Sequence, residues 1–580
     1  MSYEGASHAA GVVLARPDVS ALRTKQGAWI GVGSASFTIK GAGAYGVVST
    51  LLDRSDGSRT GHDLVGAFPA GSRAAVSRVL DALVTHRCVT VLDAPIAHQV
   101  SVKGPAAQWL IPFFSQLTDE PVRALDRVLA TTLHLYGGAD WLGRLRQLLG
   151  ASPLFGLRTE YHAVSDEDPV PQWEDAGLVV IDADSLPYER TVRLQDALLD
   201  RGVPHGIVGE AGRRRWILWS DDKSTGCWAC LCRYGRTAQP DAPADAVSPA
   251  PAPAPAPDDC TAAAVIHAIY QRTAGLGEHT AAAVAMPLDS SLPTVKPHPA
   301  WSAAGCRCHR AVVSPATGVQ RDDAEEALVR RNIVSPDDDS RLDDDHEHII
   351  DVLAGWTDEF LGPFRYLDGG DLPQVPFGQA RATLLVGPAE VHEITAATLS
   401  SREALYQAAL GGLERFAARH DGPRPNLSAG WTLDEAVYRA LLRQSMLTPV
   451  DDAEWVPVSD DDLGHDECAA FSRYIQRGVE RTHGCEALRW FGTRLPNGVY
   501  RVLGRATGKA VSRGAGACYA EAVSTALLRL VNDDSALVPL NPHFRTWTEV
   551  WGHIARPQCA EVTAQTVPFA RQQVRLVEMA

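Results

Sequence analysis

The stretch Ala176-Gly177-Leu178-Val179-Val180-Ile181 decides the fold class of this chain. Its last four residues are an uninterrupted apolar run, which is typical of a strand buried on both faces of a parallel sheet. A helical pattern follows over residues 188–199. Further short apolar runs that we interpret as strands occupy residues 133–136, 206–209 and 216–219. Alternating strands and helices predict an α/β domain, to which we assign residues 101–315.

A different pattern precedes this domain. Residues 28–32 and 36–40 alternate like two half-buried strands, and residues 44–52 favour a helix. Asp56-Gly57 predicts a turn, Thr60 a helix cap, and Ser72 the cap of a longer helix that reaches residue 87. With a closing strand at residues 89–92, these elements predict a winged helix-turn-helix domain within residues 1–100.

The rest of the chain is a third block, residues 316–580. Helical patterns cover residues 400–420 and 521–532, and we interpret two acidic runs, 337–347 and 460–467, as exposed loops. An Ala-Pro tract at residues 240–257 cannot form a helix or a sheet interior and is predicted to be an extended spacer. The expected fold class is therefore multidomain α/β, with an α+β character overall.

Bulk properties restrict the class of function. The chain has 580 residues, which suggests three or four domains, and its net charge of −16 disfavours binding to nucleic acid. No apolar run approaches the roughly 18 residues of a membrane-spanning helix. The first residues lack the pattern of a secretory signal, so we expect a cytoplasmic protein without a membrane partner.

The cysteines are the most specific chemical signal. Of eleven cysteines, five fall in two tight groups around residues 227–232 and 306–308. Two such groups can each form a knuckle and together supply four thiolates to one tetrahedral zinc ion. A site filled by sulfur has no position for water, so the zinc would be structural. The predicted ligands are Cys227, Cys230, Cys306 and Cys308, with Cys232 or His309 as alternative ligands.

Nucleotide-binding signals are incomplete. The turn at residues 137–143 lacks glycine at the three offsets that a dinucleotide-binding loop requires, which favours a tight strand-to-helix turn. Residues 504–509 are one residue short of a phosphate-binding loop, and Ala510 stands where a magnesium-binding hydroxyl is needed. ATP is therefore not expected to bind productively.

Taken together, the three blocks resemble the ocin-ThiF-like proteins, which are the F proteins of thiopeptide and other azole-containing peptide pathways. Residues 21–95 resemble a PqqD-like peptide-recognition element, which implies that a leader peptide binds as an added strand. An edge strand carries unpaired amide and carbonyl groups that such a peptide can satisfy. The candidate contacts, some of whose apolar members must face the core instead, are Ser36, Phe37, Thr38, Ile39, Lys40, Arg73, Val76, Arg78 and Val79.

The other two blocks look like members of this family that have lost activity. Residues 105–310 resemble a ThiF-like domain, but the Asn-Leu-x-Arg-Gln segment of adenylating members is missing. Residues 345–535 resemble part of a YcaO domain, whose metal-binding helix reads Ser-x-x-Glu-x-x-Glu-Arg. Here the matching stretch is Ala408-x-x-Gly411-x-x-Glu414-Arg415, and Arg529 stands where a second helix would carry a metal-binding glutamate. Losing carboxylates should abolish magnesium binding, because magnesium needs hard oxygen ligands.

The resulting hypothesis is a non-catalytic scaffold. It would bind the leader of a ribosomal precursor peptide and present the core to a separate ATP-dependent YcaO cyclodehydratase for thiazoline or oxazoline formation. The implied partners are the leader, the YcaO protein and an azoline dehydrogenase, and a homodimer stays open. Two alternatives also stay open: a catalytic cyclodehydratase or peptide-adenylating enzyme, and a winged-helix DNA-binding regulator.

Overall fold

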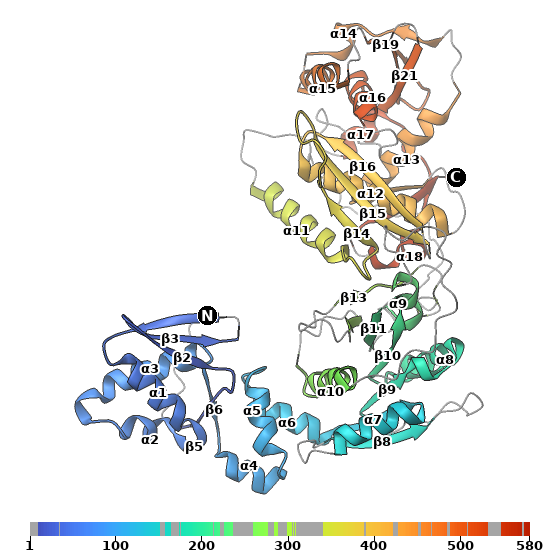
Figure 1. Ribbon diagram of the computed structural model, residues 1–580. Helices are drawn as coiled ribbons and strands as arrows, with labels where there is room; N and C mark the ends of the chain where they lie inside the picture. The colour runs from blue at the N-terminus through green and yellow to red at the C-terminus, as the bar shows by residue number, and fades with distance from the viewer. Residues whose placement is uncertain are drawn as a thin grey trace.

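The computed structural model describes residues 10–579 except 34, 151–156, 164–172, 174–175, 213, 221–225, 236–258, 277–282, 288–297, 304–305, 307, 309–339, 388–389, 421–426, 450–453, 466, 484–487, 507–508, 532–546 and 571–572. The predicted Ala-Pro spacer and His309 lie outside the described residues. The described chain is a multidomain mixture of helices and strands, whose three parts follow one another in sequence (Figure 1).

The N-terminal domain contains two small sheets and three helices. One sheet has the order β5-β1-β6 and the other the order β2-β3-β4. Its elements are β1 (Val12–Ala15), β2 (Ser20–Thr24), β3 (Gly27–Val32), β4 (Ala35–Lys40), α1 (Ala44–Arg54), β5 (Asp56–Thr60), α2 (Gly61–Gly66), α3 (Arg73–Thr85) and β6 (Val89–Leu92). Apolar residues of β3, α1 and α3, among them Ile30, Val48 and Leu80, form its core.

Most local expectations for this domain were correct; the exceptions are strands β1, β2 and β5, which were not expected, and the cap at Ser72. Thr60 caps α2 in a capping box with Asp63, as predicted. The segment after Asp56 is strand β5 rather than only a turn, because it pairs with β1, a strand that the sequence analysis did not identify. Ser72 does not cap α3; its hydroxyl donates to the carbonyl of Pro69 instead. The winged-helix assignment itself stays a prediction.

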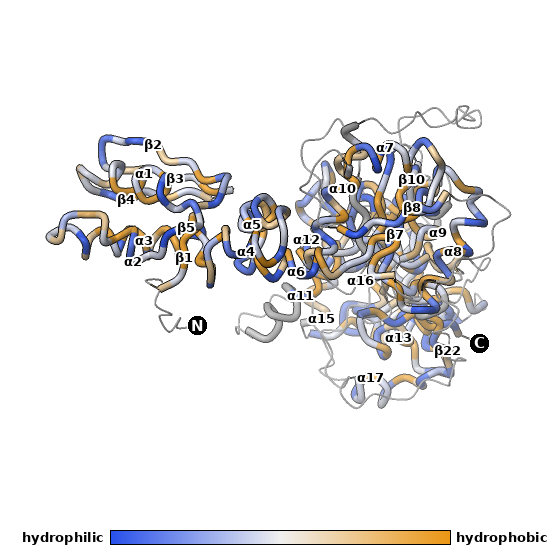
Figure 2. The backbone as a smooth tube through the Cα atoms, turned by 90° about the horizontal axis from the view of Figure 1, so that it is seen from below, coloured by the Kyte–Doolittle hydropathy of each residue, from blue (hydrophilic) through white to orange (hydrophobic). Residues whose placement is uncertain are grey.

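Three helices connect this domain to the rest of the protein: α4 (Ile96–Lys103), α5 (Ala107–Ser115) and α6 (Pro121–Ala130). Seen from below, the N-terminal domain stands to one side, and these helices bridge the gap (Figure 2). Apolar residues of α5 and α6, including Ile111, Phe114 and Leu125, join the core of the central domain. The connection is therefore a packed structure rather than a bare linker.

The central domain is built on a seven-stranded sheet of order β13-β12-β11-β10-β9-β7-β8. Strands β8, β7, β9 and β10 are parallel, and β11 to β13 continue antiparallel. Its elements are β7 (Thr132–Gly137), α7 (Ala139–Gly150), β8 (Arg158–Ala163), β9 (Leu178–Asp182), α8 (Tyr188–Arg201), β10 (His205–Ala211), β11 (Arg214–Ser220), α9 (Trp228–Gly235), α10 (Asp259–Thr273), β12 (Ala283–Pro287) and β13 (His298–Ala300).

The run that decided the fold class behaves as predicted. All five residues of β9 are buried, and their side chains alternate between two cores on opposite faces of the sheet. Val180 packs with residues of α7 and α10 on one face, whereas Val179 and Ile181 pack with residues of α8 and α9 on the other. A strand covered on both faces requires apolar residues at every position, which explains the uninterrupted run.

The C-terminal part contains three further sheets, of order β14-β15-β16, β17-β23-β22 and β18-β19-β20-β21. Its strands are β14 (Phe364–Asp368), β15 (Gly378–Gly387), β16 (Glu390–Thr398), β17 (Leu427–Gly430), β18 (Val456–Pro457), β19 (Arg489–Arg494), β20 (Tyr500–Ala506), β21 (Lys509–Gly516), β22 (Cys559–Glu561) and β23 (Arg575–Met579). Its helices are α11 (Ser340–Trp356), α12 (Ser401–His420), α13 (Leu433–Leu447), α14 (Asp460–Leu463), α15 (Glu467–His483), α16 (Tyr519–Val531), α17 (Trp547–His553) and α18 (Thr563–Thr566).

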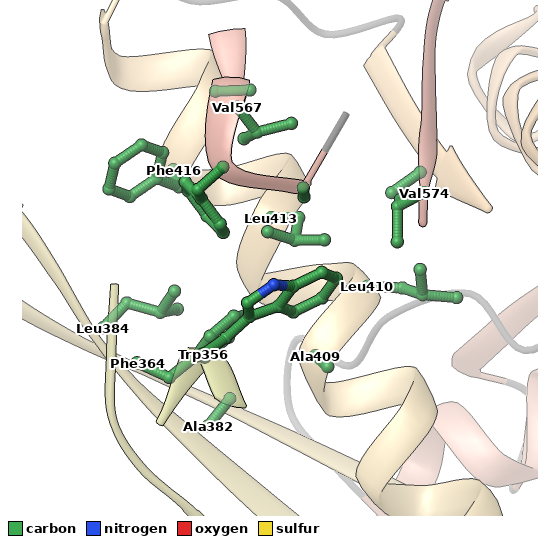
Figure 3. Packing of buried hydrophobic residues seen from close by; sticks show 14 of the residues in the cluster. Trp356, Phe364, Ala382, Leu384, Ala409, Leu410, Leu413, Phe416, Val567 and Val574 are labelled. Carbon is green, nitrogen blue, oxygen red and sulfur yellow. The ribbon is translucent and has the colours of Figure 1, made fainter. Parts of the chain in front are cut away.

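Helix α12 organises the largest core of this part. Leu410, Leu413 and Phe416 pack against Trp356 of α11 and Phe364 of β14 (Figure 3). The two acidic runs were wrongly interpreted as loops, because each contributes to a helix, α11 and α14. None of the described helices combines the length and apolar content needed to cross a membrane.

Candidate functional site

Strand β4 has a free edge. It pairs with β3 on one side, and no described strand pairs with its other side. Gly41, just beyond β4, donates its N–H to the carbonyl of Gln26 at 2.8 Å. Because neighbouring residues of an antiparallel strand point their backbone groups to opposite sides, every second residue of β4 is directed away from β3. These residues are Ser36, Thr38 and Lys40, and all three are exposed.

The opposite set of β4 side chains packs at the border of the domain core. Phe37 and Ile39 are half-buried, and the Phe37 ring stacks on the His86 ring at the end of α3, with centroids 4.0 Å apart. Val79 of α3 is also half-buried at the border of the core. Val76 is only 1% exposed and belongs to the core, so its predicted contact with a peptide is corrected. The half-buried apolar residues left as candidates for peptide contact are Phe37, Ile39 and Val79, which we call the apolar wall.

The two predicted arginines differ in availability. Arg73 donates from Nε to the carbonyl of Phe68 at 3.0 Å and from Nη2 to the carbonyl of Gly66 at 2.9 Å. It thus satisfies carbonyls at the end of α2 rather than pointing to a ligand. Arg78 is exposed and makes no ion pair with any described residue. Of the pair, Arg78 is the cation that a peptide carboxylate can reach.

The four predicted cysteine ligands converge. The Sγ–Sγ distances are 3.6 Å for Cys227–Cys230, 3.4 Å for Cys227–Cys306 and 3.6 Å for Cys230–Cys308. A tetrahedral zinc ion with bonds of about 2.3 Å needs edges near 3.8 Å, so the four sulfurs need to move apart only slightly. All four cysteines are buried, and together they form a group able to hold a metal ion.

Cys232, which is close in sequence to two of the four cysteines, packs in a different core. Cys232 is buried on α9 in a different core with Trp228 and Leu231, which resolves the ambiguity in favour of Cys230. The backbone N–H of Ala303 donates to Cys230 Sγ at 3.2 Å, as a partner of a metal-bound thiolate would. The four cysteines also belong to the core that contains α11 and α12, so they lie where the central domain meets the C-terminal part.

The glycine turn after β7 is filled by side chains of this chain. A Cβ on Gly137 would lie 2.7 Å from the Cβ of Asp182 and 2.8 Å from the Trp141 ring. A Cβ on Gly138 would lie 2.7 Å from the hydroxyl oxygen of Ser185. Burial raises the pKa of Asp182 to about 6, although Ser185 donates a hydrogen bond to its carboxyl group. The glycines therefore accommodate protein atoms where a nucleotide-binding loop would approach phosphate.

A small pocket of about 190 Å³ lies at the carboxyl ends of β9 and β10. Asp184 and Glu210 are among its lining residues. Arg215 pairs with Asp184 at 2.8 Å. The volume is below the roughly 300–1,000 Å³ that is typical of ligand pockets.

In the C-terminal part, the charge of Glu414 is neutralised internally. Glu414 of α12 is buried; its Oε1 accepts from the N–H of Ala429 at 2.9 Å and from Arg439 Nη2 at 3.2 Å, and its Oε2 accepts from Arg443. The two guanidinium groups hold the pKa of Glu414 below its usual value, against burial, which acts to raise it. Both carboxylate oxygens thus accept hydrogen bonds from groups of this chain.

The other polar members of this network were not predicted from the sequence. Gln407 donates to Glu403 Oε1 at 2.6 Å and accepts from Arg439. Glu403, Gln407 and Glu414 are spaced four and seven residues apart, which places them on one face of α12. That spacing of polar residues in an otherwise apolar helix was the signal available. On α16, Arg529 Nη1 donates to the Met446 sulfur at 3.1 Å.

The fold of this chain is similar to that of two solved heterocyclase structures. A heterocyclase solved in complex with substrate and cofactor aligns with a TM-score of 0.61 at 11% identity, over 98% of this chain and 94% of that chain. The heterocyclase TruD aligns with a TM-score of 0.52 at 12% identity, over the same shares. Their fold extends through this chain. At such low identity, the likeness establishes the fold and nothing about activity.

Other comparisons add little. MccB from E. coli aligns over 51% of this chain and 98% of its own, at 13% identity, but its TM-score of 0.35 is too low to support a structural argument. No protein-family model matches the sequence, and no curated protein does.

Proposed function

We propose that this protein captures the leader of a ribosomal precursor peptide and presents the core to a separate YcaO cyclodehydratase for azoline formation. The observation that carries this proposal is the free edge of β4, beside an apolar wall formed by Phe37, Ile39 and Val79. An extended leader would pair with the exposed backbone groups of β4 and place alternate side chains against that wall. Arg78 would pair with an acidic leader residue.

Two features support a scaffold rather than a catalyst. Both oxygens of Glu414 are engaged by Arg439 and Arg443, so the remaining carboxylate of the metal-binding pattern is internally satisfied. Asp182 and Ser185 occupy the space around the glycine turn in the central domain. Zinc held by the four cysteines would be structural, because four thiolates leave no coordination position for water. The contribution to the reaction is then local concentration, which tethering raises to about millimolar.

One observation favours a second candidate. The fold likeness to heterocyclases covers 98% of the chain, which is also what an intact catalytic cyclodehydratase would show. Purified full-length protein incubated with a precursor peptide and ATP distinguishes the two. Phosphate release without a partner protein supports catalysis, whereas release only after addition of a YcaO protein supports the scaffold.

Leader capture is tested by removing one backbone donor from β4. In Thr38→Pro the outward N–H is lost while the hydrogen bonds to β3 remain, and proline is tolerated on such an edge. We expect the affinity for a fluorescein-labelled leader to fall about tenfold or more, because a hydrogen bond is lost and the added strand cannot pack closely. The probe is the N-terminal half of a Cys/Ser/Thr-rich precursor peptide, and fluorescence anisotropy measures its binding to full-length protein.

Two matched controls accompany this variant. Thr38→Val keeps the N–H and should bind normally. Ala21→Pro removes an outward N–H from β2, the opposite edge of the same sheet, and should also bind normally. Equal loss in Thr38→Pro and Ala21→Pro, or loss in neither, would rule out strand addition at β4.

A further inference from the structure

Strands β7 and β8 bring two histidines and a glutamate together on one face of the central sheet. His134 lies opposite Glu160 in the register, and Tyr136 lies opposite His162. Residues two apart on a strand share a face, so His134, Glu160 and His162 project to the same side. This group lies at the β8 edge of the sheet, whereas β13 and the cysteines that follow it lie at the other end of the strand order.

The three ligand-type atoms surround a common point. His134 Nδ1 lies 3.1 Å from His162 Nε2, and Glu160 Oε2 lies 3.5 Å from the first nitrogen and 3.7 Å from the second. The two longer distances exceed those of ordinary hydrogen bonds, so the carboxylate sits beside both rings without bonding closely to either. The point equidistant from the three atoms is about 2.0 Å from each, which matches the Zn–N and Zn–O bond lengths of proteins.

Tyr136 packs against one ligand of the group, and Glu160 leaves the group accessible to solvent. The Tyr136 ring stacks on the His162 ring, with centroids 4.4 Å apart and planes 11° apart. The His134 side chain is 13% exposed, whereas that of Glu160 is 58% exposed. His134 is therefore largely buried against the sheet, whereas Glu160 reaches the solvent. An ion can enter the site from the Glu160 side.

We propose that His134, Glu160 and His162 form a second metal site, separate from the four cysteines, that binds a divalent first-row transition ion such as Zn²⁺. Two imidazoles and one carboxylate are the donors that such ions prefer, and they leave a fourth position for water. In the present structure the two ring planes are nearly parallel, 7° apart, and His134 Nδ1 lies at hydrogen-bond distance from His162 Nε2. On binding, each ring turns toward the common point, and a proton on either of these nitrogens moves to the far nitrogen of its own ring.

Cobalt titration of the full-length, metal-free protein tests this site. Co²⁺ bound by cysteines gives sulfur-to-metal charge-transfer absorption, whereas Co²⁺ bound by nitrogen and oxygen gives only ligand-field bands. We expect wild type to bind one ion of each kind per chain. His162→Gln and Glu160→Gln should lose the ion without thiolate absorption and keep the other, and metal analysis after dialysis against Zn²⁺ should show the same difference.

Matched variants exclude general effects. His98→Gln and Glu189→Gln remove the same functional groups from exposed positions on α4 and α8 and should bind as wild type does. Circular dichroism verifies folding, which the exposed Glu160→Gln change should not alter. Wild type that binds only the thiolate-coordinated ion, or His162→Gln that binds both ions, would overturn the proposal. Leader binding is a separate measurement, so failure here is distinguishable from failure of the proposed function.

Discussion

At the scale of single residues, Glu414 is the clearest case of a motif residue whose role depends on its partners. The sequence shows a glutamate in a metal-binding pattern, and the structure shows it between Arg439, which is fully buried, and Arg443. The two guanidinium groups thus supply the positive charge that a bound metal ion would otherwise supply to Glu414. The charge of Glu414 stabilises the fold instead of ligating an ion.

Replacement of this carboxylate should destabilise the protein. We expect Glu414→Gln to lower the free energy of unfolding at neutral pH by about 3–5 kcal/mol, because it leaves a buried guanidinium without its counter-charge. Urea unfolding followed by tryptophan fluorescence measures the change. Glu189→Gln, on the exposed start of α8, should change stability by less than about 0.5 kcal/mol.

The same residue predicts a dependence on pH. Because the pKa of Glu414 is lower in the folded protein than in the unfolded chain, its stabilising contribution is complete above the unfolded pKa. That contribution disappears as the pH falls through the folded pKa. The difference in stability between wild type and Glu414→Gln should therefore shrink under acid conditions, and a constant difference would contradict this assignment.

At the scale of elements, the turn between β7 and α7 shows how a glycine pair can have a packing role. Gly137 and Gly138 allow Asp182, Trp141 and Ser185 to approach the backbone. The sequence analysis favoured a tight turn because the glycine spacing was incomplete. The structure adds the reason for the glycines, since any side chain there would collide with neighbouring atoms.

Two alanine substitutions separate packing from helix propensity. Gly137→Ala should lower stability by about 1–3 kcal/mol through overpacking. Gly143→Ala, in α7 with no atom within 4 Å of the added Cβ, should raise it by up to about 1 kcal/mol, because alanine favours helix. Thermal unfolding of both variants checks the opposite signs. Equal effects would mean that the turn is not closely packed.

At the scale of the whole molecule, the cysteine group connects two domains. Cys227 directly precedes α9 of the central domain and Cys230 lies within it, and all four cysteines pack in the core of α11 and α12. Arg365 of β14 strengthens the junction by donating to the carbonyl of Tyr234 on α9. His298 Nδ1 and Asp358 Oδ2 add a buried hydrogen bond across it at 2.6 Å. Metal binding here should therefore stabilise both parts.

Loss of a ligand should weaken this junction. We expect Cys306→Ala to abolish metal binding by the cysteine group, lower the melting temperature and increase protease cleavage between the central and C-terminal parts. Metal analysis, calorimetry and limited proteolysis measure these effects. Cys232→Ala, next to the group but outside it, should retain the metal; loss of metal in that variant would assign Cys232 as a ligand.

The sequence by itself determined the elements whose signals are local. The buried strand at residues 178–181, the capping box at Thr60 and the close spacing of the cysteines were all predictable, because periodicity and capping involve neighbouring residues. Only the tertiary structure decided that Val76 faces the core, that Arg73 serves α2, and that Glu414 is neutralised by two arginines. Those roles depend on contacts between segments that are distant in the sequence. Such contacts produce no periodic pattern of residues along the chain.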